Sequence, residues 1–228
     1  DTADELSSLL QRRVPEMTFY SPYSFLRNIN PETLCKETFI EPLLQSVYPG
    51  KATVSAVTAN GQKTYIVWKA LPWDSEHFHR RVFRIELVTS DHDNAEAISV
   101  ALKSFLGKFT ERGDYLFITV PCEDLPVLHA LSYAGFRRVE TMLNYFFPGF
   151  IAVEDVKAPV RRAGEEDIPV LREIAMRKRN RFDRVHADPA FTDKEADNYL
   201  GTFAAQCVRG FADIVMVPDI PGVKPFGF

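Results

Sequence analysis

Alternating and helical patterns of hydrophobic residues divide the first half of the chain into short strands and helices. Two β-rich runs, 51–59 and 62–69, flank the dipeptide Asn60-Gly61. This dipeptide predicts a tight hairpin turn, because both central positions of such a turn need positive φ. A further β-rich run over 82–88 predicts a third strand. A helix is predicted over 94–112, where one stripe holds Ile98, Leu102, Phe105, Leu106 and Phe109.

A strand, a helix and a second strand are predicted in the centre of the chain. Tyr115–Val120 is an apolar, β-rich run with the length of a buried strand. Asp124 is placed to cap the helix that follows, and Gly135 supplies the left-handed residue that ends it. After Arg137 the hydrophobic period changes to two, which predicts a strand. One face of that strand would hold Val139, Thr141, Leu143, Tyr145 and Phe147.

Residues before the hairpin are predicted to be helical. Asn30 and Pro31 suit the cap and the first turn of a helix that ends near Tyr48. Because the polar residue precedes the proline, the pair marks a helix start rather than a break.

A second unit begins after a short linker expected between residues 148 and 159. Val160–Ala163 predicts its first strand, and an apolar stripe after Glu166 predicts its first helix. Thr192 and Glu195 form a capping box for a longer helix. Further strands are predicted at 213–217 and 223–228.

Composition excludes several classes of protein. The 228 residues are 46% hydrophobic and 12% aromatic, enough to form cores and too many for a disordered chain. The formal net charge of −4, from 27 basic and 31 acidic residues, gives no electrostatic basis for nucleic-acid binding. No apolar run has the length of a membrane span, and the start of the sequence does not resemble a leader peptide, so we expect neither. The three cysteines are isolated and odd in number, which favours the reducing cytoplasm over a disulfide framework.

The order of motifs resembles the GNAT acyltransferase superfamily. Ala134-Gly-Phe, between the central helix and its second strand, is typical of the last helix of that fold, and the run from Val160 to Leu171 is typical of its entry. Together with Trp73-Asp-Ser-Glu-His-Phe, Asn180-Arg-Phe, Asp188-Pro and Val208-Arg-Gly, these motifs resemble the acetyltransferases that modify the 4-amino group of nucleotide-linked dideoxy sugars. The resemblance covers about residues 70–217 and rests on motif order.

This resemblance implies an α/β (α+β) fold of two GNAT-like units with mixed, mostly antiparallel sheets flanked by helices. The first unit would occupy residues 1–150, and residues 157–228 would be the start of a second, incomplete GNAT domain. The implied activity is acetyl transfer from acetyl-CoA to a small-molecule amine. A homodimer is compatible with the resemblance. The alternative is a non-catalytic binding or assembly module derived from the same fold.

One departure from the family pattern concerns the phosphate-binding loop. In the superfamily a glycine-rich loop after the fourth strand grips the pyrophosphate of acetyl-CoA with bare backbone N–H groups. The corresponding segment of the first unit, Asp91–Glu96, has no glycine and carries acids that would repel phosphate. In the second unit the sequence ends at Phe228, before such a loop or the usual general acid, so we expect a fragment. Catalytic and cofactor-binding residues are therefore not assigned.

A histidine-rich segment raises the question of a metal site. His77 and His79 would share one side of a strand, near Asp74 and Glu76, but no further ligand cluster accompanies them. A solvated turn or the rim of a substrate cleft is favoured, and no metal is predicted. The aromatic candidates for that rim are Trp73 and Phe78, although side chains of these types more often fill a core.

A basic run over residues 177–186 has two interpretations. It can be a solvated helix end, which cations stabilise. By the family resemblance it is the loop that borders the acceptor substrate. Arg181, Arg184 and His186 would then meet the diphosphate of a nucleotide sugar, since the arginine fork suits phosphate oxygens.

Overall fold

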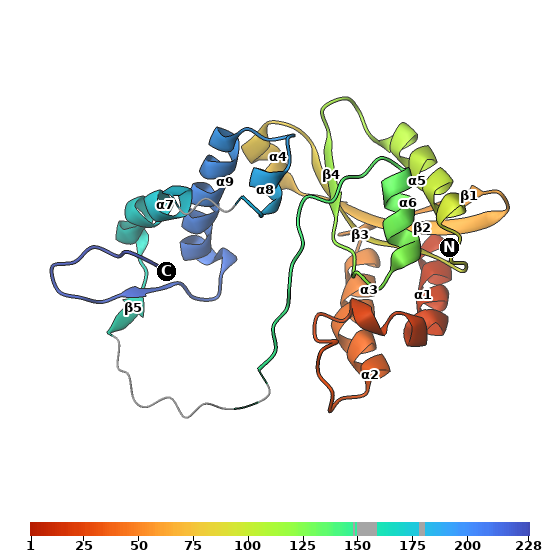
Figure 1. Cartoon of the computed structure of the whole chain (residues 1–228), viewed down its shortest axis with the longest axis horizontal. Coiled ribbons are helices and arrows are strands. Elements are labelled where there is room, and N and C mark those ends of the chain that lie inside the picture. The colour runs from red at the N-terminus through yellow and green to blue at the C-terminus, as the bar shows by residue number, and fades with distance from the viewer. Residues whose placement is uncertain (148, 150–158, 178–180) are drawn as a thin grey trace. The chain divides into compact units, whose positions relative to one another are not determined.

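The computed structural model describes residues 1–147, 149, 159–177 and 181–228. The chain forms two compact units, Asp1–Arg137 and Arg138–Phe228 (Figure 1). Its class is α+β, with a mixed four-stranded sheet flanked by helices. The linker expected between 148 and 159 lies largely outside the described residues. None of the described helices combines the length and the apolar character that crossing a membrane would require.

The sheet of the first unit contains three antiparallel strands and one parallel strand. Its order is β1 (Thr53–Ala59), β2 (Gln62–Ala70), β3 (Val82–Ser90) and β4 (Tyr115–Ile118), with β4 parallel to β3. The predicted hairpin is confirmed, because Asn60 and Gly61 have φ angles of 52° and 75°. The mixed, mostly antiparallel character predicted for the sheet is also confirmed.

A one-residue bulge in β3 changes which face its side chains point to. Val67 pairs with Leu87, but the next residue, Trp68, pairs with Ile85, so Glu86 is an extra residue on β3. An extra residue reverses the alternation of side chains beyond it. Ile85 therefore packs with the helices on one face of the sheet, and Leu87 packs with those on the other.

Helices cover both faces of this sheet. On the Leu87 face lie α1 (Thr2–Arg13), α2 (Pro31–Cys35) and α3 (Glu41–Val47). On the Ile85 face lie α5 (Ala95–Phe109) and α6 (Leu125–Tyr133), which stand next to each other in Figure 1. The predicted helix start at Asn30 is confirmed, since its side-chain oxygen accepts the Thr33 N–H at 3.0 Å. A π-helical turn, η3 (Lys36–Ile40), separates α2 from α3.

The predicted strand after Arg137 is wrong, although the helix before it is as expected. Asp124 caps α6 by accepting the Val127 N–H at 3.2 Å, and Gly135 ends it with a φ of 95°. Residues 137–147 form no strand, and Tyr145 is 88% exposed. Alternation produces a strand only where a partner supplies a hydrogen-bond ladder, and no described strand pairs with this segment.

The second unit contains a small two-stranded sheet and a helix pair. β5 (Val160–Arg162) pairs with β6 (Met216–Pro218) in antiparallel register. α7 (Ile168–Arg177) packs against α9 (Asp193–Gln206), where a Cβ on Gly201 would meet Met176 Cγ at 2.9 Å. The close approach of these two helices therefore depends on a glycine.

Predictions for the second unit are partly confirmed. The capping box is present, because the Thr192 hydroxyl accepts the Glu195 N–H and the Glu195 carboxylate accepts the Thr192 N–H. Instead of the strand predicted at 213–217, the structure has the shorter strand β6, which begins at Met216. The strand predicted at 223–228 is wrong, since those residues pair with no described strand.

An ion pair with a buried carboxylate fastens β5 to the first turn of the unit. Arg161 binds Asp167 through two parallel hydrogen bonds of 2.6 and 2.8 Å, and the Gly164 N–H donates to the same carboxylate at 3.0 Å. The guanidinium and this N–H hold the pKa of Asp167 at about 2. The side chain of Asp167 is only 5% exposed, so its charge depends on these donors.

Substituting Asp167→Asn should destabilise the protein by roughly 1–3 kcal/mol at pH 7, because the Arg161 guanidinium keeps its charge and loses the carboxylate that it binds. The folded-state pKa lies below that of an unfolded aspartate, about 3.9. The stabilisation is therefore complete above about pH 4 and is lost as the pH falls towards 2. Urea denaturation at pH 7 and at pH 3 measures both effects.

Glu165→Gln is the matched control, because Glu165 pairs with Arg209 on the surface with 66% of its side chain exposed. We expect no measurable change in the free energy of unfolding, because exposed ion pairs contribute little to stability. Equal losses for Asp167→Asn and Glu165→Gln would contradict a special role for the Arg161–Asp167 pair.

Candidate ligand-binding site

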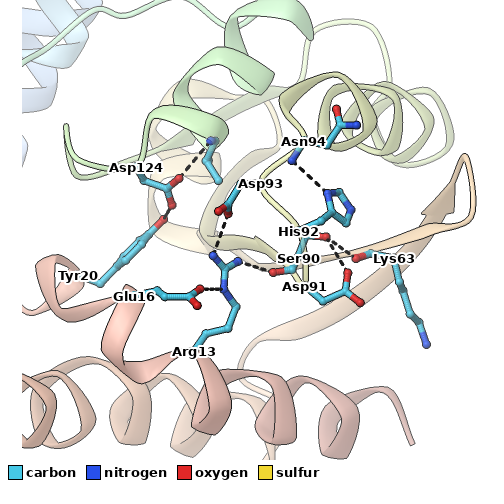
Figure 2. Close-up of polar contacts among 11 residues, drawn as sticks. Arg13, Glu16, Tyr20, Lys63, Ser90, Asp91, His92, Asp93, Asn94 and Asp124 are labelled. Carbon is cyan, nitrogen blue, oxygen red and sulfur yellow. Dashed lines mark hydrogen bonds and ion pairs between the residues drawn. The ribbon is translucent and has the colours of Figure 1, made fainter.

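A pocket of about 170 Å³ lies in the first unit at the carboxyl end of β3. Its walls come from the end of α1 and the chain after it, from Val88–Ser90 of β3, from the loop that holds His92 and Asp93, from α5, and from the start of α6. Segments far apart in sequence therefore meet around one concavity (Figure 2).

The strand arrangement explains why a pocket forms at this place. β4 pairs with β3 only where Tyr115–Ile118 lies opposite Val82–Ile85, whereas β3 continues to Ser90. In open sheets with parallel strands, ligands bind outside the carboxyl ends of the strands, where neighbouring connections diverge. The pocket lies at such an end and is the candidate functional site of this unit.

Arg13 forms one wall and is surrounded by acceptors. Its Nε donates to Glu16 Oε2 at 2.8 Å, and its Nη2 donates to Asp93 Oδ1 at 3.0 Å. A third hydrogen bond runs from Nη1 to the Ser90 carbonyl oxygen (Figure 2). The guanidinium thus ties the end of α1 to the end of β3, and its charge is matched by two carboxylates.

Tyr20 and Asp124 form the opposite wall. The Tyr20 hydroxyl donates to Asp124 Oδ2 at 2.6 Å, while the other carboxylate oxygen caps α6 (Figure 2). Burial, together with the Asp124 charge, raises the pKa of Tyr20 well above its usual value. Tyr20 therefore stays protonated and acts as a donor. Its ring stacks on Phe39 with centroids 4.9 Å apart.

His92 lies between two acids of the loop after β3. The Asn94 N–H points to its Nδ1 at 3.3 Å, which places the ring proton on Nε2 in the neutral form. Nε2 is buried and has no hydrogen-bond partner among the described residues. Burial lowers the pKa of His92 although Asp91 and Asp93 oppose this shift, so the ring is neutral at pH 7.

The pocket carries an excess of negative charge. Four carboxylates line it, and Arg13 is the single arginine or lysine among its lining residues. Neutral His92 does not offset them. The acidic residues are Glu16, Asp93, Glu123 and Asp124. The pocket therefore favours a cation over an anion.

The pyrophosphate of acetyl-CoA does not fit the loop after β3. The side chain of Asn94 already accepts the Glu96 and Ala97 N–H groups at the start of α5, each at 3.1 Å. A phosphate would have to displace this cap and approach Asp91 and Asp93. The loop therefore offers a phosphate neither these N–H groups nor a favourable charge.

The predicted aromatic candidates lie on a helix of the first unit. Trp73 and Phe78 belong to α4 (Pro72–Phe78), which begins at a proline. Trp73 stacks on His77 with centroids 5.7 Å apart, and Phe78 is buried. Neither of them lines the pocket described above.

The strand geometry predicted for the two histidines is wrong. His77 lies within α4, and His79 ends the helix in the left-handed conformation with φ of 51°. Among the described residues, no group of three or more histidine, cysteine or acidic side chains is placed to hold a metal ion.

The predicted diphosphate ligands belong to the second unit and differ in their surroundings. Arg181 is exposed, and Arg184 begins a short helix, α8 (Arg184–Ala187). The side chain of His186 is 1% exposed, with Nδ1 2.8 Å from Asp183 and Nε2 3.1 Å from Asp197. Because both ring nitrogens already face carboxylates, the role predicted for His186 in binding a diphosphate is not supported by its position.

The cysteines do not contribute to the pocket. Cys35 is buried and donates to the Met17 carbonyl oxygen at 3.1 Å, and burial raises its pKa to about 11. Cys122 is exposed and Cys207 is half-buried. The Cys35 thiol is therefore protonated at neutral pH.

Sequence reasoning found Asp124 as a helix cap and the acids of the loop after β3, but it missed Arg13 and Tyr20 as pocket residues. Both act through partners that lie 77 to 104 positions further along the chain. Local sequence rules address caps and turns and do not reach such partners. The parallel pairing of β3 with β4, whose carboxyl ends mark ligand sites, is likewise visible only in the fold.

Removing the Tyr20 hydroxyl should destabilise the first unit. In Tyr20→Phe the Asp124 carboxylate loses a charge-assisted hydrogen bond, for which we expect a cost of about 1–2 kcal/mol. Tyr48→Phe is the matched control, because the Tyr48 hydroxyl lies 3.4 Å from Asp4 on an exposed residue. Chemical denaturation of both variants measures the difference, and equal midpoints would contradict the proposed strength of the Tyr20–Asp124 bond.

Comparisons with known proteins provide no family for the chain. No protein-family model, no curated protein and no solved structure matches it. The strand order and the chemistry of the pocket are therefore the basis for a functional conclusion.

Proposed function

We propose that the protein is an N-acetyltransferase with acetyl-CoA as donor and a small-molecule amine as acceptor. In the overall reaction the amine nitrogen forms a bond to the acetyl carbon, the carbon–sulfur bond breaks, and the amine proton is released. The family resemblance implies a nucleotide-linked amino sugar as the acceptor. It also implies that both units follow the GNAT plan.

The observation that carries this proposal is that β4 ends beside Ile85, whereas β3 continues to Ser90. Beyond Ile85 the backbone of β3 runs on to Ser90 without β4 beside it. An extended ligand can then use backbone N–H and C=O groups of β3 as a strand would. The unbranched arm of an acyl-CoA has this extended shape.

The acidic loop after β3 restricts how acetyl-CoA can bind. Its diphosphate is disfavoured at Asp91–Asn94, where the Asn94 side chain already accepts the N–H groups at the start of α5. In this proposal only the acyl arm lies along β3, and the diphosphate lies away from the acidic loop. The proposal assigns the pocket of this unit to the acceptor side of the reaction, where an amine complements carboxylates.

A second candidate function is a non-catalytic binding module derived from an acyltransferase fold. The same loop favours it, since a unit that has given up phosphate binding can retain a ligand pocket without transferring an acetyl group. The two candidates differ in a measurable product, because only the enzyme releases free thiol from acetyl-CoA.

Thermal unfolding with and without acetyl-CoA tests donor binding. A ligand at a hundred times its Kd adds about 2.7 kcal/mol to the stability of the folded state. For a chain of this size we expect a rise in Tm of roughly 5–10 °C. ADP is the control ligand, because it carries the diphosphate without the acyl arm.

Release of thiol from acetyl-CoA in the presence of a panel of amines tests transfer itself. Thiol release that depends on the amine supports the enzyme. A rise in Tm without thiol release supports the binding module. If acetyl-CoA does not raise the Tm and no thiol is released, the acetyltransferase proposal is contradicted.

A further inference from the structure

We propose that the pocket between α1, β3 and α6 binds a small organic ammonium ion of about the size of one six-membered ring. The geometry of the pocket and the charges on its walls support the proposal. Its interpretation as the acceptor site rests on the proposed function, whereas the binding of the cation does not.

The charge of the pocket selects the sign of the ligand. Four carboxylates line it, and its one guanidinium is already bound by Glu16, Asp93 and the Ser90 carbonyl oxygen. Asp124 is engaged by Tyr20 and by the start of α6. Within the part of the chain that the structure describes, the Glu123 carboxylate has a weak contact with Cys122, at 3.4 Å, and no ion pair, so its charge remains available to a ligand. An ammonium group would reduce this excess of negative charge, and an anion would add to it.

The size and the lining of the pocket select the body of the ligand. Its volume of about 170 Å³ is close to the ~150 Å³ of a cavity that holds a benzene-sized molecule. Val88, Ile98 and Val127 supply apolar wall on the side of the sheet core. Phe19 and Tyr20 supply aromatic rings, which attract cations through their faces. A ring that carries one ammonium group uses both kinds of wall.

The construction of the pocket suits binding without a large rearrangement. Arg13 and Tyr20 fasten the chain after α1 to β3 and to α6 through hydrogen bonds drawn in Figure 2. A pocket whose walls are already joined loses little conformational freedom when a ligand enters.

Three ring compounds of similar shape test the sign of the charge. Cyclohexylamine is protonated at pH 7.5, cyclohexanol is neutral, and cyclohexanecarboxylate is negative. Binding to the full chain is measured by ligand-observed NMR titration in the absence of acetyl-CoA. We expect the amine to bind at least tenfold more tightly than the alcohol, with no binding of the carboxylate. We also expect weaker amine binding at high salt. Equal binding of amine and alcohol would overturn the inference.

Charge-removing variants locate the site. The double variant Glu16→Gln/Glu123→Gln should weaken cyclohexylamine binding at least fivefold. Glu37→Gln, an exposed acid outside the pocket, should leave it unchanged. Unchanged affinity in the double variant would overturn the assignment to this pocket. If the double variant does not fold, the comparison of the three compounds on the natural chain still decides the sign of the charge.

Thiol release separates this inference from the proposed function. Binding of the amine without thiol release from acetyl-CoA keeps the inference and contradicts the acetyltransferase. Thiol release with an unchanged KM for the amine in the double variant keeps the acetyltransferase and overturns the inference.

Discussion

The extra residue in β3 determines how the first unit distributes its hydrophobic side chains. With regular alternation, Ile85 and Leu87 would face the same side of the sheet. Because Glu86 is inserted between their pairing positions, Ile85 faces α5 and α6, and Leu87 faces α1 to α3. Val88 then returns to the α5 side and reaches the pocket. Both cores and the apolar wall of the pocket thus depend on one irregularity in one strand.

Local rules predicted the elements whose ends are fixed by neighbouring residues. The turn at Asn60-Gly61, the cap at Asp124 and the capping box at Thr192 are satisfied by atoms within a few positions in the chain. Such contacts can be read from a short stretch of sequence. They placed most helices and the hairpin correctly.

Predictions failed where an element depends on a partner far away in sequence. The alternation after Arg137 describes a strand, but the ladder that would hold it is missing among the described residues. The strand expected at His77 and His79 failed for a local reason instead, since Pro72 begins a helix there. The bulge at Glu86 has no local signal, since it becomes visible only in the register with β2. The pocket was missed for the same reason, as its walls meet only in the folded unit.

The bond between Tyr20 and Asp124 also has a consequence for the order of folding. These residues stand 104 positions apart, and the Arg13 contacts with Ser90 and Asp93 span 77 and 80 positions. Contacts of such separation form after local helices and hairpins, because long loops must close first. During synthesis the hydrogen bond between Tyr20 and Asp124 can form only after α6 has been made. The pocket is thus completed late, and a ligand that requires its walls can recognise only chains whose first unit is finished.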